Sequence, residues 1–154
     1  GDARVVNVAS EAHQSVRRLP LDDLQSARGY SAVRAYSVSK LANVMFTYAL
    51  ARRLRGSGGV TANALHPGVI NSDFARGVGG SYGLLFKLVR LILAPPEEGA
   101  RTSVFLAAYP RLGGATGRYY KKSRPVRSSR ASYDEAAQEW LWRESARLTG
   151  TDWP

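Results

Sequence analysis

A tyrosine and a lysine four residues apart, Tyr36 and Lys40 in the run YSVSK, form the pattern with the clearest chemical meaning. In a helix, four residues make slightly more than one turn and rise about 6 Å, so the phenol and the ammonium lie side by side. A nearby cation favours the phenolate form of a tyrosine and brings its proton transfer toward neutral pH. The pair therefore predicts a general acid/base, although this spacing alone more often marks a solvated helix surface.

Ser10 directly follows a short apolar run, residues 4–9, that is typical of a strand buried in a parallel sheet. In open parallel α/β sheets the reacting groups gather at the carboxyl ends of the strands. There the Ser10 hydroxyl could donate to a substrate carbonyl oxygen while Tyr36 delivers or removes a proton. The alternative is that Ser10 only satisfies a backbone group at the end of the strand.

A third candidate segment, His66-Pro67-Gly68, ends a second apolar run, residues 60–65. Proline and glycine give a sharp turn. The amides that follow, together with Ser72, could lie against a flat polar ligand. The alternative is an ordinary turn between a strand and a helix.

These residues can act together only if strands and a helix bring them to one edge of a sheet. Residues 34–55 contain no proline or glycine and predict a long helix between strands 4–9 and 60–65, which is a right-handed βαβ unit. One face of that helix carries the polar residues Tyr36, Lys40, Asn43 and Thr47. Further expected elements are helices over 81–93, 97–109 and 132–148, the last opened by the capping box SYDE, and a strand near 117–120.

Composition narrows the possible functions. None of the 154 residues is cysteine and only His13 and His66 are histidine, so no metal site is expected. We expect His66 to be structural and His13 to be an exposed loop residue. The sequence contains no run of about twenty apolar residues, so no integral membrane span is expected. A cytoplasmic location is the default expectation.

The formal net charge of +10 could attract nucleic acid, anionic lipid or a phosphorylated cofactor. The densest basic stretch has no aromatic repeat or groove-entering motif beyond one tyrosine pair. A solvated basic face is therefore favoured over an anion-binding surface, and no nucleic-acid partner is expected. The residues of this stretch are Arg118, Lys121, Lys122, Arg124, Arg127 and Arg130.

The order VNVAS, YSVSKLANVMFTYALARRL and VTANALHPGVINSDF resembles the short-chain dehydrogenases/reductases, and the LAN and HPG context is similar to their retinol-dehydrogenase-like branch. The resemblance covers almost the whole chain. It implies α/β architecture: the C-terminal half of a Rossmann-type doubly wound parallel sheet, with about three strands plus helices. Residues 1–154 would then be the catalytic part of a single domain whose N-terminal dinucleotide-binding half is absent, and would be inactive alone.

The same resemblance implies a reaction, the interconversion of an alcohol and a carbonyl. Ser10 would polarise the carbonyl, Tyr36 would exchange the proton, and Lys40 would hold the nicotinamide ribose. The cofactor would be NAD or NADP, with NADP slightly favoured, and the substrate a small apolar alcohol, aldehyde or ketone; a homodimer is compatible with it. The residues implied to line the cofactor are Tyr36, Lys40, Pro67, Gly68, Val69, Ile70 and Ser72.

Residues 81–94 fall where that family keeps its substrate lid. Their apolar side chains suit an apolar substrate, but a core helix has the same composition, and Lys87 and Arg90 leave a membrane-surface contact open. Two other function classes remain. One is a non-catalytic binding module of the same fold, and the other is a binder of nucleic acid or anionic surfaces driven by charge, which would leave YSVSK unexplained.

Overall fold

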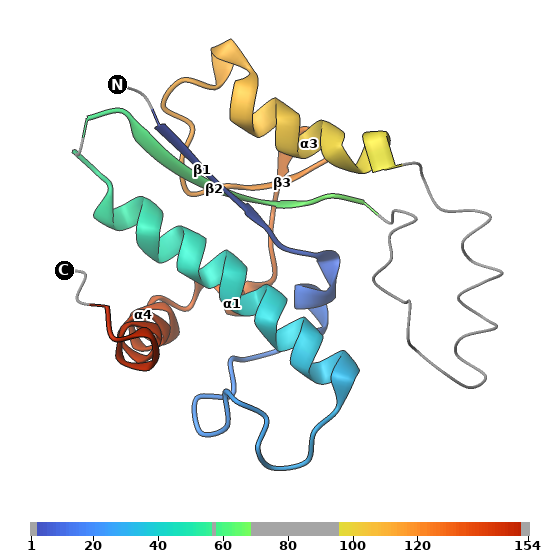
Figure 1. The fold of residues 1–154 in the computed structure, drawn as a ribbon, viewed down its shortest axis with the longest axis vertical. Helices are drawn as coiled ribbons and strands as arrows, with labels where there is room; N and C mark the ends of the chain where they lie inside the picture. The colour runs from blue at the N-terminus through green and yellow to red at the C-terminus, as the bar shows by residue number, and fades with distance from the viewer. Residues whose placement is uncertain (1–2, 57, 69–95, 152–154) are drawn as a thin grey trace, which may run out of the picture.

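The computed structural model describes residues 3–56, 58–68 and 96–151 (Figure 1). In these residues one sheet has the strand order β1-β2-β3-β4. The strands are β1 (Ala3–Val8), β2 (Val60–His66), β3 (Tyr119–Lys121) and β4 (Arg124–Val126). The first three strands run parallel, whereas β4 pairs antiparallel with β3. The predicted α/β fold is confirmed, and the fourth strand makes the sheet mixed rather than wholly parallel.

Helices lie on both faces of this sheet (Figure 1). On one face α1 (Ala32–Arg53) packs against the strands and against α4 (Glu135–Thr149), and α3 (Pro96–Ala108) covers the other face. This is the layer order of a doubly wound sheet. Short 3-10 turns complete the described elements: η1 (Glu11–Ser15), η3 (Pro110–Leu112) and η4 (Arg130–Tyr133).

Helix α1 is the central element because it is buried on two sides. Leu41 and Met45 pack with α4, and Val44 packs with residues of the sheet. The polar face predicted for this helix lies along β1, where Lys40, Asn43 and Thr47 make hydrogen bonds to the strand. The Ser31 hydroxyl caps the first turn by accepting from the amide of Arg34. The predicted helix is confirmed with its start two residues earlier.

The start of α4 differs from the prediction. The carboxylate of Asp134 accepts from the Ala137 amide at 3.0 Å and forms the N-cap. Ser132, expected to open the helix as part of a capping box, instead lies in η4, where its hydroxyl donates to the Ser129 carbonyl. Two good capping residues stand close together here, and tertiary contacts select the second.

The hairpin that adds β4 was not predicted. Its two turn residues, Lys122 and Ser123, have φ of +50° and +58°, the conformation that a two-residue hairpin turn requires. Asparagine and glycine usually mark such a turn, and neither is present. Pro125 fits in β4 because edge strands tolerate proline. Residues 81–94, for which a substrate lid, a core helix and a membrane-surface contact were left open, lie outside the described residues, as do Val69, Ile70 and Ser72.

Candidate active site

The Tyr36 and Lys40 side chains lie together near the carboxyl end of β1. The Lys40 ammonium is 5.4 Å from the centre of the Tyr36 ring. It also lies 3.5 Å from the Val8 carbonyl oxygen, which accepts a second hydrogen bond, at 3.2 Å, from the Asn43 amide. These bonds hold the Tyr-Lys face of α1 against the last residue of the strand, two positions before Ser10.

Ser10 follows β1 and is the N-cap of η1. Its hydroxyl oxygen accepts from the Ala12 amide at 3.2 Å, so the hydroxyl does satisfy a backbone group. A hydroxyl that accepts one bond keeps its own proton to donate elsewhere. Ser10 is half-buried, as are Tyr36 and Lys40, and all three side chains can be reached by a ligand.

The turn after β2 lies beside the turn after β1. The Ala9 amide donates to the Leu65 carbonyl at 2.8 Å, and the Glu11 amide donates to Nδ1 of His66 at 3.4 Å. The two candidate segments, Ser10 and Pro67-Gly68, therefore follow adjacent strands at the same sheet edge. Gly68 has φ of +99°, which favours glycine because a side chain would be strained there.

A charged group that the sequence analysis did not identify links these turns to β3. The Glu11 carboxylate lies 2.5 Å from the Lys121 ammonium and 3.7 Å from Nε2 of His66. The hydrogen bond from Lys121 holds the pKa of Glu11 below its usual range, and burial lowers the pKa of His66. Because the partners come from three strand ends, only the sheet order could have revealed this contact.

Beside these strand ends the structure has a cavity of about 450 Å³ between the β2 turn, α3 and the β3-β4 hairpin. Its wall includes cationic, acidic and hydroxyl side chains, which could bind polar groups of a ligand. Its described lining residues are His66, Pro67, Gly68, Glu98, Gly99, Arg101, Thr102, Lys121, Lys122 and Ser123.

His13 is placed differently from the prediction of an exposed loop residue. Its side chain is fully buried, with Nδ1 2.5 Å from the Ser10 carbonyl oxygen and Nε2 accepting from the Ser129 amide at 3.1 Å. Its ring also meets the Tyr119 ring edge-on at 4.8 Å between centres. The local sequence is polar and carries no signal for this burial, because the covering residues come from the far end of the chain.

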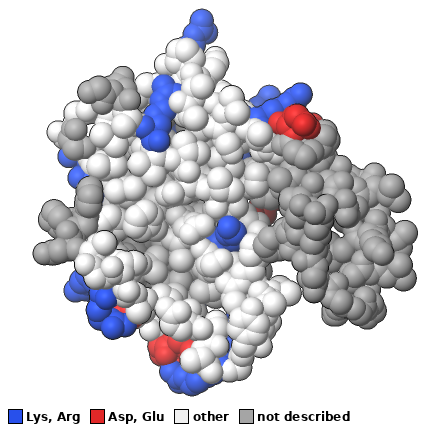
Figure 2. All heavy atoms as spheres, in the orientation of Figure 1, with Lys and Arg blue, Asp and Glu red and all other residues white. Residues whose placement is uncertain are grey.

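On the face shown in Figure 2, Lys and Arg side chains stand at separate places rather than in one patch. In the ranges 3–56, 58–68 and 96–151 no three His, Asp, Glu or Cys side chains are grouped as metal ligands. None of the helices in the same ranges has the length and apolar character to cross a membrane.

Comparison with curated proteins gives close matches over nearly the whole chain, although no family model matches it. The chain is 43% identical to human polyprenol dehydrogenase over 150 residues, which are 96% of this chain and 45% of that protein. It is 40% identical to human retinol dehydrogenase 12 over 151 residues, 98% of this chain and 47% of that protein. The chain therefore spans about half the length of the curated relatives it matches.

Solved structures give the same fold. A structure described as an uncharacterized protein from Mycobacterium paratuberculosis matches 99% of this chain and 52% of its own, with 32% identity and a TM-score of 0.71. An NADPH-bound carbonyl reductase from chicken fatty liver matches 82% of this chain and 42% of its own, with 21% identity and a TM-score of 0.52. The second likeness shows the fold alone.

Proposed function

Because this chain belongs to the short-chain dehydrogenase/reductase family, in its retinol-dehydrogenase-like branch, we propose that it carries the proton-transfer residues of an NAD(P)-dependent oxidoreductase. The reaction is the interconversion of an alcohol and a carbonyl. The observation that supports it most directly is the Tyr36-Lys40 pair, held at the end of β1 by the Val8 carbonyl, two residues before Ser10.

In this proposal Tyr36 gives its phenolic proton to the carbonyl oxygen during reduction and takes it back during oxidation. Ser10 donates its free hydroxyl proton to the same oxygen and polarises the carbonyl. The Lys40 ammonium, 5.4 Å from the Tyr36 ring, stabilises the phenolate that remains after the proton has left. The protein thus contributes placement and proton transfer.

The residues present fit a nicotinamide cofactor, which supplies or accepts the hydride when bound. Among the described residues the Lys40 ammonium has no carboxylate partner, and its one carbonyl contact is long, at 3.5 Å. An ammonium has three protons, so Lys40 keeps donors for ribose hydroxyls. Pro67 and Gly68 would lie against the nicotinamide. NADP stays slightly favoured over NAD as a prediction from the family resemblance.

The proposed substrate is an apolar alcohol or its carbonyl form. The names of the two relatives cited refer to polyprenol and retinol, both of which are apolar primary alcohols. The predicted apolar segment 81–94 would suit such a substrate. A cytoplasmic location and a homodimer remain predictions.

The test compares the full-length protein that contains this chain with its Tyr36→Phe variant. NAD(P)H oxidation is followed with a panel of apolar aldehydes and ketones. Loss of the acid/base should lower kcat at least about 100-fold while cofactor affinity stays within about threefold. Tyr30→Phe is the matched control, because Tyr30 is 74% exposed, and it should keep full activity. Equal activity in Tyr36→Phe, or none in any form despite correct folding, would favour the binding-module alternative.

A further inference from the structure

His13 joins two segments that are 116 residues apart. Because the Ser129 amide is a donor, Nε2 of His13 must hold the lone pair that accepts it. The imidazole then carries its proton on Nδ1 and donates it to the Ser10 carbonyl oxygen, 2.5 Å away. Both ring nitrogens are thus paired inside a site that water does not reach.

The segment bonded to Nε2 of His13, residues 128–132, is itself held by hydrogen bonds. The Ser128 hydroxyl lies 2.6 Å from the Tyr48 hydroxyl of α1 and 2.7 Å from the Ser132 hydroxyl. The Ser132 hydroxyl donates to the Ser129 carbonyl at 2.7 Å. The segment bonded to His13 is therefore tied to α1, the helix that carries Tyr36 and Lys40.

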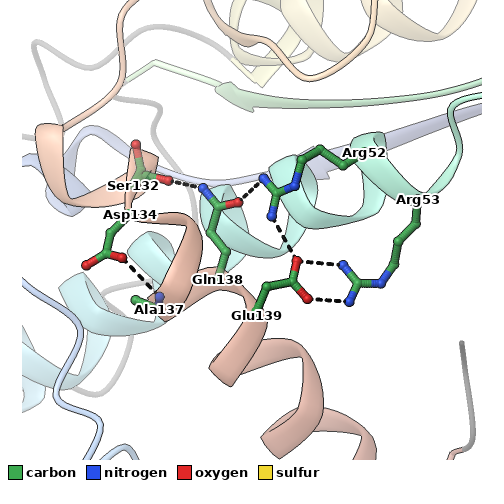
Figure 3. A network of polar contacts seen from close by, with 7 residues as sticks. All are labelled: Arg52, Arg53, Ser132, Asp134, Ala137, Gln138 and Glu139. Carbon is green, nitrogen blue, oxygen red and sulfur yellow. Dashed lines mark hydrogen bonds and ion pairs between the residues drawn. The ribbon is translucent and has the colours of Figure 1, made fainter.

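Figure 3 shows how this tie continues into α4. The Gln138 side chain donates to the Ser132 carbonyl at 2.6 Å and accepts from the Arg52 guanidinium. Gln138 and Ser132 are both buried. A set of buried hydrogen bonds thus runs from α1 through the Ser128–Ser132 segment to His13, and a partly buried bond continues it from His13 to Ser10.

We propose that His13 is a positioning residue for Ser10, and that its Nδ1 proton fixes the Ser10 carbonyl and with it the place of the Ser10 hydroxyl relative to α1. This inference rests on the proposed function, in which Ser10 touches the substrate. Ser10 has an extended backbone, and its hydroxyl accepts a hydrogen bond from the Ala12 amide within η1. A change in the direction of the Ser10 carbonyl would therefore move the η1 turn and the Ser10 hydroxyl with it. A misplacement of about 1 Å can cost about 100-fold in rate.

Three substitutions of His13 in the full-length protein separate positioning from simple structural support. In His13→Asn the side-chain amide nitrogen takes the place of Nδ1 and can donate to the Ser10 carbonyl, but the bond from the Ser129 amide is lost. In His13→Gln the side-chain oxygen takes the place of Nε2 and can accept from the Ser129 amide, but the donor to the Ser10 carbonyl is lost. Leucine has the shape of asparagine but no donor. Gln14→Asn, at an exposed position in the same η1 turn, is the control.

We expect His13→Asn to keep kcat per folded molecule within about threefold, and His13→Gln and His13→Leu to lose at least about tenfold, with the KM for the cofactor unchanged in all three. If His13→Gln does not fold, the asparagine and leucine variants decide the question. Equal kcat per folded molecule in the three variants would overturn the proposal, because a purely structural histidine changes only the amount of folded protein.

Hydrogen exchange gives a readout that does not depend on activity. Amides of residues 10–16 should exchange faster in His13→Gln and His13→Leu than in His13→Asn, at matched global stability. If the unaltered protein shows no turnover, the proposed function fails, while the exchange pattern still decides whether His13 holds the Ser10 turn. The same exchange rate in all three variants would overturn the positioning role even in an active enzyme.

Discussion

The two histidines are both buried, and burial is the main cause that lowers the pKa of each below 6.5. The charged groups that face them are Glu11, which opposes this shift at both rings, and Lys121, which adds to it at His66. Tyr119 contacts His13 but stays neutral because burial raises its pKa. In the unfolded chain both histidines take up protons near pH 6.5, whereas the folded chain binds them only at lower pH.

The contribution of the two histidines to the free energy of unfolding should therefore be fully present above pH 6.5. It should decrease as the pH falls from 6.5 through their lowered pKa values. Each histidine contributes a slope of up to about 1.4 kcal/mol per pH unit in that window. Urea unfolding between pH 7.5 and 5.5 measures it. His13→Asn removes one of the two titrations and should lower the slope, whereas Gln14→Asn should leave it unchanged. An unaltered slope in His13→Asn would show that His13 does not titrate with folding.

At the scale of elements, an acidic residue on α4 clamps the end of α1 (Figure 3). The Glu139 carboxylate is 3.0 Å from the Arg52 guanidinium and 2.6 Å from that of Arg53, and Arg53 also lies 4.2 Å from the centre of the Trp142 ring. The hydrogen bond from Arg53 is the main cause that lowers the pKa of Glu139 to about 2. A lowered carboxyl pKa stabilises the fold above its unfolded value near 4.5, and this stability is lost as the pH falls toward 2.

Replacing Glu139 with glutamine should therefore weaken the attachment of α4 to α1. Because the Glu139 side chain is 41% exposed, solvent screens the pair, and we expect a loss on the order of 1 kcal/mol at pH 7. Glu144→Gln is the matched control, since among the described residues Glu144 pairs with Arg147 of the same helix and not with another element. Urea unfolding compares the two variants. Equal effects of both substitutions would refute the clamp.

Gly117, just before β3, lies close to α1. It has φ of +65°, and a Cβ atom there would lie 3.3 Å from the Cβ of Ala51. Gly114 has a similar φ of +75° but open space around it. Gly114→Ala should cost about 1 kcal/mol from backbone strain alone, and Gly117→Ala about 1 kcal/mol more from the contact with α1. Thermal unfolding of both variants checks this; equal losses would show that α1 moves aside freely.

The elements that could be predicted are those whose signals are local. Long periodic or apolar runs were enough for α1, α3, β1 and β2. The β4 hairpin was missed because Lys122 and Ser123 adopt positive φ without the usual turn residues. Among the candidate site residues, the proximity of Tyr36 and Lys40 could be predicted because they are one helical turn apart. The contacts of His13 with Ser129 and of Glu11 with Lys121 join residues more than 100 positions apart, and no local pattern records them.

At the scale of the whole molecule, the outer edge of β1 has no strand partner in the described sheet. Within those residues β1 pairs on one side only, with β2, and Val8 is 47% exposed. Unpaired strand edges invite pairing with another chain. The net charge of +10 acts against this, because like-charged copies repel each other.

These two effects predict how the 154-residue chain behaves by itself. Screening shortens the range of charge repulsion to about 10 Å at 0.1 M salt, so self-association through β1 should increase with NaCl. Binding driven by positive charge, as to DNA, should decrease instead. Sedimentation velocity across a salt series separates the two. Val8→Lys places a charge on the open edge and should reduce association without loss of helix content, and if it associates as strongly as the unaltered chain, another surface is responsible.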